Sequence, residues 1–239
     1  MPRSILVIDV GGTNIKILAT GHEERRKTPS GRAVTAQAMV DAVKKLAEGW
    51  AYEAVSIGYP GPVIRGRPVA EPHNLGHGWV GFDYRKAFGC PVKVINDAAM
   101  QALGSYEDGK MLFLGLGTGL GSAMIVDGII EPMELAHLPY RRATYEYYVG
   151  KRAMKRVGKK KWRKNVAEVV ERLTAALEPD YVVLGGGNAR KLKELPPGCR
   201  IGENSNAFRG GFRLWEDNVS VRHKHLQAEG LIPAKRRQP

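Results

Sequence analysis

Two neighbouring glycines near the start of the chain are flanked by side chains that could handle a phosphate group. In the stretch LVIDVGGTNIKILAT, Asp9 precedes Gly11 and Gly12, and Thr13 and Lys16 follow them. Glycine has no Cβ atom to hold a ligand away, so successive backbone N–H groups can approach an anion closely. Thr13 would add a hydroxyl donor and Lys16 a positive charge, and the Asp9 carboxylate could hold Mg²⁺ through water. An ordinary hairpin turn, the alternative interpretation, would need neither of these charges.

A second glycine turn, in the stretch LFLGLGTGLGSAMI, repeats this chemistry with Gly117, Thr118 and Gly119. Both stretches are typical of a strand, a turn of Gly and Thr, and another strand. This internal echo predicts two related lobes that each offer a glycine turn to a shared cleft. Neither stretch fits the G-x-x-x-x-G-K-[ST] pattern or a strand-to-helix G-x-G-x-x-G pattern, so we expect neither a P-loop nor a Rossmann site.

Alternating strand and helix patterns around these turns predict an α/β fold. One helix is expected over residues 35–48, behind a Thr35 cap. A second is expected over residues 166–177, with Asn165 and Glu168 as a capping pair. A third glycine cluster, in VVLGGGNARKL, follows an expected strand and leads into an expected helix. The predicted strands cover residues 4–10, 15–19, 54–58, 92–95, 111–116, 122–126 and 181–184.

The net charge of +13 is concentrated in one segment of the 239 residues. Residues 151–164 hold nine Lys or Arg and no acid, which leaves +4 for the rest of the chain. Such a run can be a solvated helix face, or it can dock a polyanion through counterion release and long-range attraction. The candidates for docking are Lys159, Lys160 and Lys161. The pattern leaves both interpretations open.

Other compositional features exclude several classes of protein. The longest uncharged run, residues 111–126, carries four glycines and is too short to span a bilayer. The N-terminus lacks the pattern of a secretory signal, so we expect a cytoplasmic protein without a membrane partner. Cys90 and Cys199 are too few for a disulfide framework or a thiolate-rich zinc site.

Seven motifs together resemble the ROK family of sugar kinases. In order they are DVGGTNIK, IGYPGPV, HNLGHGWVGFD, VINDAAMQALG, LGTGLGSAMI, ELAH and VVLGGG, and they span residues 5–187. The resemblance implies the two-lobed actin-like, hexokinase-type ATPase fold. It is closest to the zinc-free branch that includes polyphosphate glucokinases and polyphosphate/ATP glucomannokinases. It therefore implies Mg²⁺, no structural zinc, no nucleic-acid partner and a homodimer.

The resemblance also assigns roles to individual residues. Asp97 matches the catalytic base, which would accept the proton of a sugar 6-hydroxyl group during its attack on a phosphoryl group. The VVLGGG motif matches the family's donor-contacting turn, at Gly185, Gly186 and Gly187. The residues that match sugar contacts are Gly61, Asn74, Asn96, Asp97, Glu134 and His137, with Glu146 as a substitute for an acidic ligand that lacks its usual context.

Two stretches depart from the family pattern. Ala136 stands where most members have glycine, and its methyl group could shift the loop or narrow the sugar pocket. The stretch NSNAFRGGFRLWED replaces a small-residue helix that usually returns to the N-terminal lobe. We expect its large apolar residues to pack, and Arg209 and Arg213 either to be exposed or to reach phosphate. Those apolar residues are Phe208, Phe212, Leu214 and Trp215.

These observations predict a phosphotransferase with two lobes. The N-terminal lobe would comprise residues 1–107, completed by 206–239, and the C-terminal lobe residues 108–205. The acceptor would be a hexose, glucose or mannose, and the donor inorganic polyphosphate, ATP or both. A strictly ATP-dependent hexose kinase and a non-catalytic polyanion-binding protein are the alternatives. A ROK transcriptional repressor is not expected, because Asp9 leaves no room for a preceding winged-helix segment.

Overall fold

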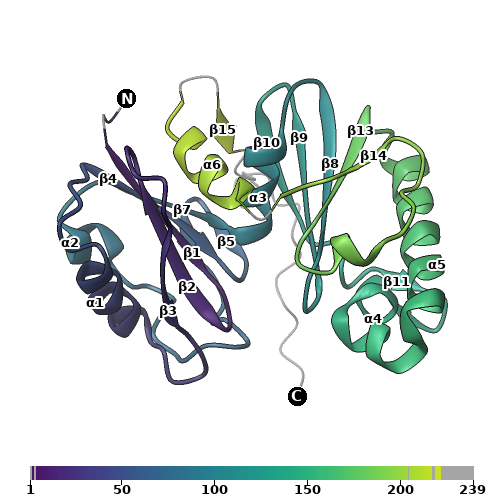
Figure 1. The fold of residues 1–239 in the computed structure, drawn as a ribbon, viewed down its shortest axis with the longest axis horizontal. Helices are drawn as coiled ribbons and strands as arrows, with labels where there is room; N and C mark the ends of the chain where they lie inside the picture. The colour runs from purple at the N-terminus through teal and green to yellow at the C-terminus, as the bar shows by residue number, and fades with distance from the viewer. Residues whose placement is uncertain (1, 3, 204, 217–218, 222–239) are drawn as a thin grey trace, which may run out of the picture.

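The computed structural model describes residues 2, 4–203, 205–216 and 219–221. Two sheets stand side by side with helices between them and on both outer faces (Figure 1). The described helices include none with the length and apolar character needed to cross a bilayer.

The first sheet has the strand order β3-β2-β1-β4-β7. β1 runs antiparallel to β2 and parallel to β4. Helices α1 (Ala36–Leu46) and α2 (Tyr84–Phe88) contribute to the apolar core on its outer face. The strands are β1 (Ile5–Val10), β2 (Asn14–Ala19), β3 (Arg26–Pro29), β4 (Ala54–Tyr59) and β7 (Val92–Asn96).

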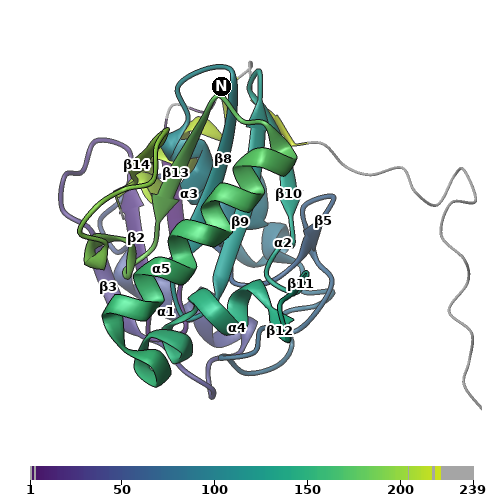
Figure 2. The same cartoon turned by 90° about the vertical axis from the view of Figure 1, so that its right-hand side faces the viewer.

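The second sheet has the order β14-β13-β8-β9-β10-β15. Its outer face is covered by α4 (Tyr145–Val149) and by α5 (Lys151–Leu177), which crosses the sheet diagonally (Figure 2). Gly158, with a φ of 74°, interrupts α5. The strands are β8 (Lys110–Leu116), β9 (Leu120–Val126), β10 (Ile129–Met133), β13 (Tyr181–Gly185), β14 (Cys199–Ile201) and β15 (Ser220–Val221).

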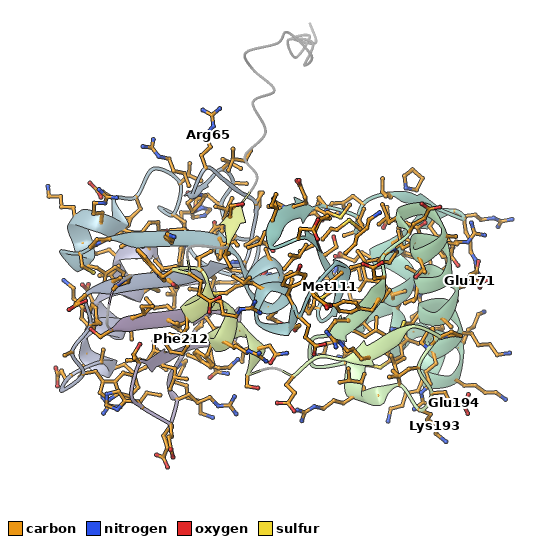
Figure 3. All side chains as sticks on the ribbon, turned by 90° about the horizontal axis from the view of Figure 1, so that it is seen from above. Arg65, Met111, Glu171, Lys193, Glu194 and Phe212 are labelled. Atoms are coloured by element: carbon orange, nitrogen blue, oxygen red, sulfur yellow. The ribbon has the colours of Figure 1, made fainter. Side chains whose placement is uncertain are left out.

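Helices α3 (Asp97–Ser105) and α6 (Asn206–Arg213) fill the space between the two sheets. They share one core with Val7 of the first sheet and Met111 of the second. From above, Met111 lies in the interior, whereas Glu171 and Lys193 project from the far end of the molecule (Figure 3). The remaining short elements are β5 (Val63–Ile64), β6 (Arg67–Pro68), β11 (Pro139–Tyr140), β12 (Ala143–Thr144) and the 3₁₀ helix η1 (Ala189–Lys191).

The α/β prediction and the predicted strands are confirmed, with strand ends that differ by at most two residues. The first helix is confirmed too, and Thr35 caps it by accepting a hydrogen bond from the N–H of Ala38 at 3.2 Å. The second predicted helix is confirmed over residues 166–177, but its start and its capping pair are wrong, because α5 begins at Lys151 and contains Asn165 and Glu168 in its interior. Cations on the exposed face do not stop a helix whose opposite face packs on a core. After the third glycine cluster only the short η1 forms.

The stretch that departs from the family pattern forms α6, which has small residues of its own. A Cβ atom on Gly210 would overlap the carbonyl oxygen of Met100 in α3. Phe208 and Leu214 are buried, as expected. Arg213 is occupied at the end of α3, where it donates to the carbonyl oxygens of Leu103 in the last turn and of the C-cap residue Tyr106, at 2.8 and 2.7 Å.

The segment after residue 205, which was predicted to complete the N-terminal lobe, contacts both sheets. Helix α6 packs on β1, where Gly211 lies against Val7, whereas β15 pairs with β10 of the second sheet. Residues 204, 217–218 and 222–239 of the predicted segments lie outside the described residues. The division into two lobes stays a prediction.

The close approach of α3 and α6 gives a stability prediction. A Cβ atom at Gly104 would overlap the carbonyl oxygen of Asn206. Gly104→Ala should therefore lower the free energy of unfolding by roughly 2 kcal/mol, since backbone atoms cannot rotate aside as a side chain can. Chemical denaturation would measure the loss. Arg209→Ala, on the exposed face of α6, is the control that should leave stability unchanged, and an equally stable Gly104→Ala variant would contradict the packing argument.

Candidate active site

Asp9 and Lys16 form an ion pair across the first glycine hairpin. They are register partners in β1 and β2, and Lys16 Nζ lies 3.0 Å from Asp9 Oδ2. The Asp9 side chain is only 13% exposed, so the lysine compensates a carboxylate that is partly removed from water. At the turn, a Cβ atom on Gly12 would come within 3.1 Å of Asn74 Cβ. The sugar-loop candidate Asn74 therefore lies beside the first phosphate-turn candidate.

Asn96 ends β7 and fixes the start of α3. Its side-chain oxygen accepts hydrogen bonds from the N–H groups of Ala98 and Ala99 at 2.9 and 3.2 Å. Its amide nitrogen donates to the carbonyl oxygen of Gly61 at 3.0 Å. The cap satisfies two helix N–H groups and connects the helix to the loop after β4. Asn96, predicted as a sugar ligand, thus also has a structural function.

Asp97 is the first residue of α3, and its environment resists ionisation. Burial raises the pKa of its carboxyl group to about 7, and the negative charges of Asp9 and Glu134 add to the rise. The N–H of Ala98, 2.8 Å from Oδ1, acts in the opposite direction by stabilising the carboxylate. Asp9, Asp97 and Glu134, from three separate parts of the chain, therefore interact electrostatically. A carboxyl group with a pKa near neutrality is suited to proton transfer.

Glu134 and His137 follow β10 and remain open to solvent. Glu134 Oε1 lies 3.9 Å from His137 Nε2, and their side chains are 64% and 71% exposed. Between them, Leu135 is buried and donates its N–H to Ser122 Oγ at 3.2 Å. Ala136 is also buried in the core on the outer face of the second sheet. The motif therefore alternates anchoring residues with exposed polar groups that are free to meet a ligand.

Glu146 lies between this motif and the second glycine turn. Its N–H donates to the carbonyl oxygen of Ala136 at 3.0 Å, and its Oε2 accepts from the N–H of Leu120 at 3.3 Å. A Cβ atom on Gly119 would overlap that carboxylate, so a larger residue there would displace the Glu146 side chain. The structure thus shows Glu146 in contact with the turn. Its predicted contact with a sugar stays a prediction.

The second and third glycine clusters are joined directly. Gly186 has a φ of 79°, and a Cβ atom there would meet the carbonyl oxygen of Leu116 at 2.7 Å. Asn188, which follows the third cluster, donates from Nδ2 to the carbonyl oxygen of Gly117 at 2.9 Å. Sequence reasoning assigned no role to Asn188. The only signal was its place after three glycines, and the contact with residue 117 depends on the pairing of β8 with β13.

A cavity of about 830 Å³ borders this region at Asn96. It follows the edge strand β7 and is lined also by β5, β6 and α2. No residue of the three glycine turns lines it, so this cavity is distinct from the candidate phosphate site.

The basic segment at residues 151–164 lies on α5 (Figure 2). Lys159, Lys160 and Lys161 are exposed, whereas the neighbouring Trp162 is fully buried. Arg163 donates from Nε to the carbonyl oxygen of Lys191 at 2.7 Å, close to the third glycine cluster. The lysines are thus accessible to a polyanion, and their docking role stays a prediction.

Comparisons with known proteins agree with this arrangement. A model described as "ROK family" matches residues 5–132. The polyphosphate glucokinase of Mycobacterium tuberculosis (strain CDC 1551 / Oshkosh) is 30% identical over 216 residues, which cover 80% of each chain. The chain belongs to the ROK family.

Solved structures of ROK proteins share the fold. The inorganic polyphosphate/ATP-glucomannokinase of Arthrobacter sp. strain KM superimposes with a TM-score of 0.74 at 26% identity, covering 87% of this chain and 96% of that one. A ROK family glucokinase from Streptomyces griseus, in complex with glucose and AMPPNP, gives 0.66 at 20% identity over 88% and 98% of the two chains. The predicted actin-like, hexokinase-type fold is thereby confirmed.

The environment of Asp97 predicts a pH dependence of stability. Its pKa rises on folding from 3.8 to about 7, so between these values the native state binds more protons than the unfolded state. Stability should therefore fall as the pH rises through this window, by at most about 4 kcal/mol from this group. Asp97→Asn should remove the penalty and raise the melting temperature more at pH 8 than at pH 4. Glu107→Gln, at an exposed ion pair, is the control, and equal shifts of the Asp97 variant at both pH values would contradict the burial effect.

Proposed function

We propose that this chain transfers a phosphoryl group from inorganic polyphosphate or ATP to the 6-hydroxyl group of a hexose, glucose or mannose. The observation that carries the proposal is the position of Asp97. This half-buried carboxyl group, with a pKa raised to about 7, begins the helix between the two sheets and interacts with Asp9 beside the first glycine turn. The relatives named as polyphosphate glucokinases and glucomannokinase support the same reaction.

Asp97 would act as the general base. Ionised, it accepts the proton of the 6-hydroxyl group while that oxygen attacks the terminal phosphorus atom and the bond to the leaving phosphate oxygen breaks. Asn96, through its bonds to Ala98 and Gly61, would keep the base in place. Two lobes that close over the substrates would exclude water, the competing acceptor.

The glycine turns would bind the phosphate groups of the donor. Gly11, Gly12 and Thr13 would do so on the first hairpin, with Lys16 neutralising the carboxylate of Asp9 until the donor arrives. Gly117, Thr118 and Gly119 would bind from the opposite side, and Gly185, Gly186 and Gly187 would contact the rest of the donor. Backbone N–H groups held in advance stabilise the charge of the transferred group without reorganisation.

The carboxylates at the first turn fit Mg²⁺. This ion is usually bound by one or two carboxylates together with water and phosphate oxygens. Asp9, supported by the nearby Asp97, offers such a set. Bound Mg²⁺ would neutralise phosphate charge during transfer.

The sugar would be held by exposed polar groups around Asp97. Glu134 and His137 offer an acceptor and a group that can donate or accept, and Asn74 offers an amide. The other candidates already hydrogen-bond within the protein, and they are Asn96, Glu146 and the carbonyl group of Gly61. Such a mixture of donors and acceptors matches hydroxyl groups, which need both kinds of partner.

The donor is the part of the proposal with a competing candidate. Polyphosphate is favoured by the exposed basic segment of α5, because a chain longer than ATP can use cations beyond the glycine turns. A strictly ATP-dependent hexose kinase is the second candidate, supported by the glycine turn after β13. A non-catalytic polyanion-binding protein would not need a carboxyl group like that of Asp97, whose pKa is raised by desolvation and by the charges of Asp9 and Glu134. A homodimer in the cytoplasm remains our prediction for the assembled enzyme.

A coupled assay that crosses glucose and mannose with ATP and polyphosphate, all with Mg²⁺, tests the function. Sugar 6-phosphate should form with at least one pair. Asp97→Asn should lower kcat by orders of magnitude and leave glucose binding nearly intact, because only the proton acceptor is lost. Wild-type binding of polyanions without any sugar phosphorylation would favour the non-catalytic alternative. Near-normal turnover by Asp97→Asn would remove that residue from the mechanism.

The basic segment gives a separate prediction about the donor. Replacing Lys159, Lys160 and Lys161 by Gln should raise the KM for long polyphosphate several-fold more than the KM for ATP, because only the long chain reaches beyond the glycine turns. Steady-state kinetics with both donors would measure the difference. Lys44 and Lys45, at the end of α1, provide a control of similar charge loss. Equal effects on the two donors would identify the segment as a solvated face.

A further inference from the structure

The carbonyl groups of the second glycine turn accept hydrogen bonds from Lys151, the first residue of α5, and from Asn188. The N–H of Lys151 donates to the carbonyl oxygens of Gly117 and Thr118 at 3.2 and 3.1 Å. The side-chain amide of Asn188 donates to the same oxygen of Gly117 at 2.9 Å. A trans peptide group is planar, and its N–H points opposite to its C=O. Holding these carbonyls therefore directs the N–H groups of Thr118 and Gly119 away from α5.

Asn188 is fixed more firmly than a surface amide. Only 6% of the residue is exposed, and its N–H donates to the carbonyl oxygen of Leu116 at 2.9 Å. Its Oδ1 accepts from Lys191 Nζ at 2.7 Å. Because an ammonium group can only donate, the oxygen of the amide must face Lys191 and the NH₂ group must face Gly117. Lys191 thus selects the one amide orientation that can hold the turn.

Lys191 is itself anchored. Its N–H donates to the carbonyl oxygen of Asn188 at 2.9 Å, and its own carbonyl oxygen accepts from Arg163 Nε at 2.7 Å. Within the described ranges, no carboxylate lies within 4.0 Å of its ammonium group. Among the described residues, the ammonium group of Lys191 thus forms no ion pair, and it donates a hydrogen bond to Asn188 Oδ1.

We propose that Asn188, oriented by Lys191, is a positioning residue for the phosphoryl donor. It would hold the peptide planes of the second glycine turn so that the N–H groups of Thr118 and Gly119 meet the phosphate. The inference rests on the proposed phosphotransfer and goes beyond it, because no donor role was assigned to Asn188 or Lys191. If Asn188 only stabilised the fold, its replacement would not change the KM for the donor more than the KM for glucose.

Asn188→Asp is the sharpest test. The carboxylate keeps the size of the amide and its contact with Lys191, but at neutral pH it cannot donate to Gly117. We expect kcat/KM for ATP and for polyphosphate to fall about tenfold, because the carbonyl oxygen of Gly117 loses one of its two donors and faces a carboxylate oxygen instead. The KM for glucose should change less than about twofold, because the peptide N–H groups of this turn are proposed to bind phosphate and not sugar.

Asn165→Asp is the matched control. Asn165 is also a buried amide, 4% exposed, but it donates to the carbonyl oxygen of Tyr148 in α4 at 3.3 Å instead of to a carbonyl group of a glycine turn. This variant should lower the melting temperature without changing the KM of either donor. A pair at Lys191 separates orientation from charge. Lys191→Gln can still donate to Asn188 and should keep most of the donor affinity, whereas Lys191→Met should lose it in the manner of Asn188→Asp.

Binding measurements make the test independent of turnover. Calorimetric titration with tripolyphosphate in Mg²⁺ should give a dissociation constant about tenfold higher for Asn188→Asp and an unchanged one for Asn165→Asp. If the wild-type protein phosphorylates no sugar but this difference persists, the proposed function fails and the positioning role stands. Unchanged tripolyphosphate binding by Asn188→Asp, or equal changes in the KM of donor and glucose, would overturn the positioning role.

Discussion

Helix α3 is packed between the two sheets, and tight contacts at both of its ends hold Asp97, its first residue, in position. At one end, a Cβ atom on Gly121 of β9 would lie only 2.7 Å from the methyl group of Ala98. At the other end, Gly104 faces the backbone of α6 without room for a methyl group. Because the helix is confined in this way, Asp97 cannot move towards water, and its carboxyl group keeps the raised pKa that desolvation causes.

Much of the fold could be predicted from the sequence because its signals are local. Strand runs, the Thr35 cap and the two glycine hairpins depend on residues that are neighbours in the chain, and the structure contains each of them. The start of α5 could not be placed this way. Its first turns are rich in cations that hide a short apolar face, and they become helical because Ala153, Met154 and Val157 pack on the core that also holds Trp162.

The candidate site, too, could be predicted only where its features are local in the sequence. Residues inside motifs, such as Asp9 and Asp97, could be named because their chemistry and order match a family. Contacts that depend on strand pairing could not. The opposed roles of Asn96, as cap and as candidate ligand, and the link from Asn188 to Gly117 require two segments to be brought together in space. The sequence also could not indicate that Arg213 satisfies carbonyl groups at the end of α3.

Helix α6 has a consequence for how the chain is made. Gly211 lies against Val7, and Ser56 of β4 donates from its hydroxyl group to the carbonyl oxygen of the same glycine at 2.6 Å. The inner face of the first sheet is therefore covered in part by a helix whose contact residue Gly211 is synthesised 155 residues after Ser56. Domains generally begin to fold from the N-terminus as they emerge. Here α6 cannot cover the apolar inner face of the first strands until residues 206–213 have been made, so a chain terminated before residue 206 has a first sheet that lacks this cover.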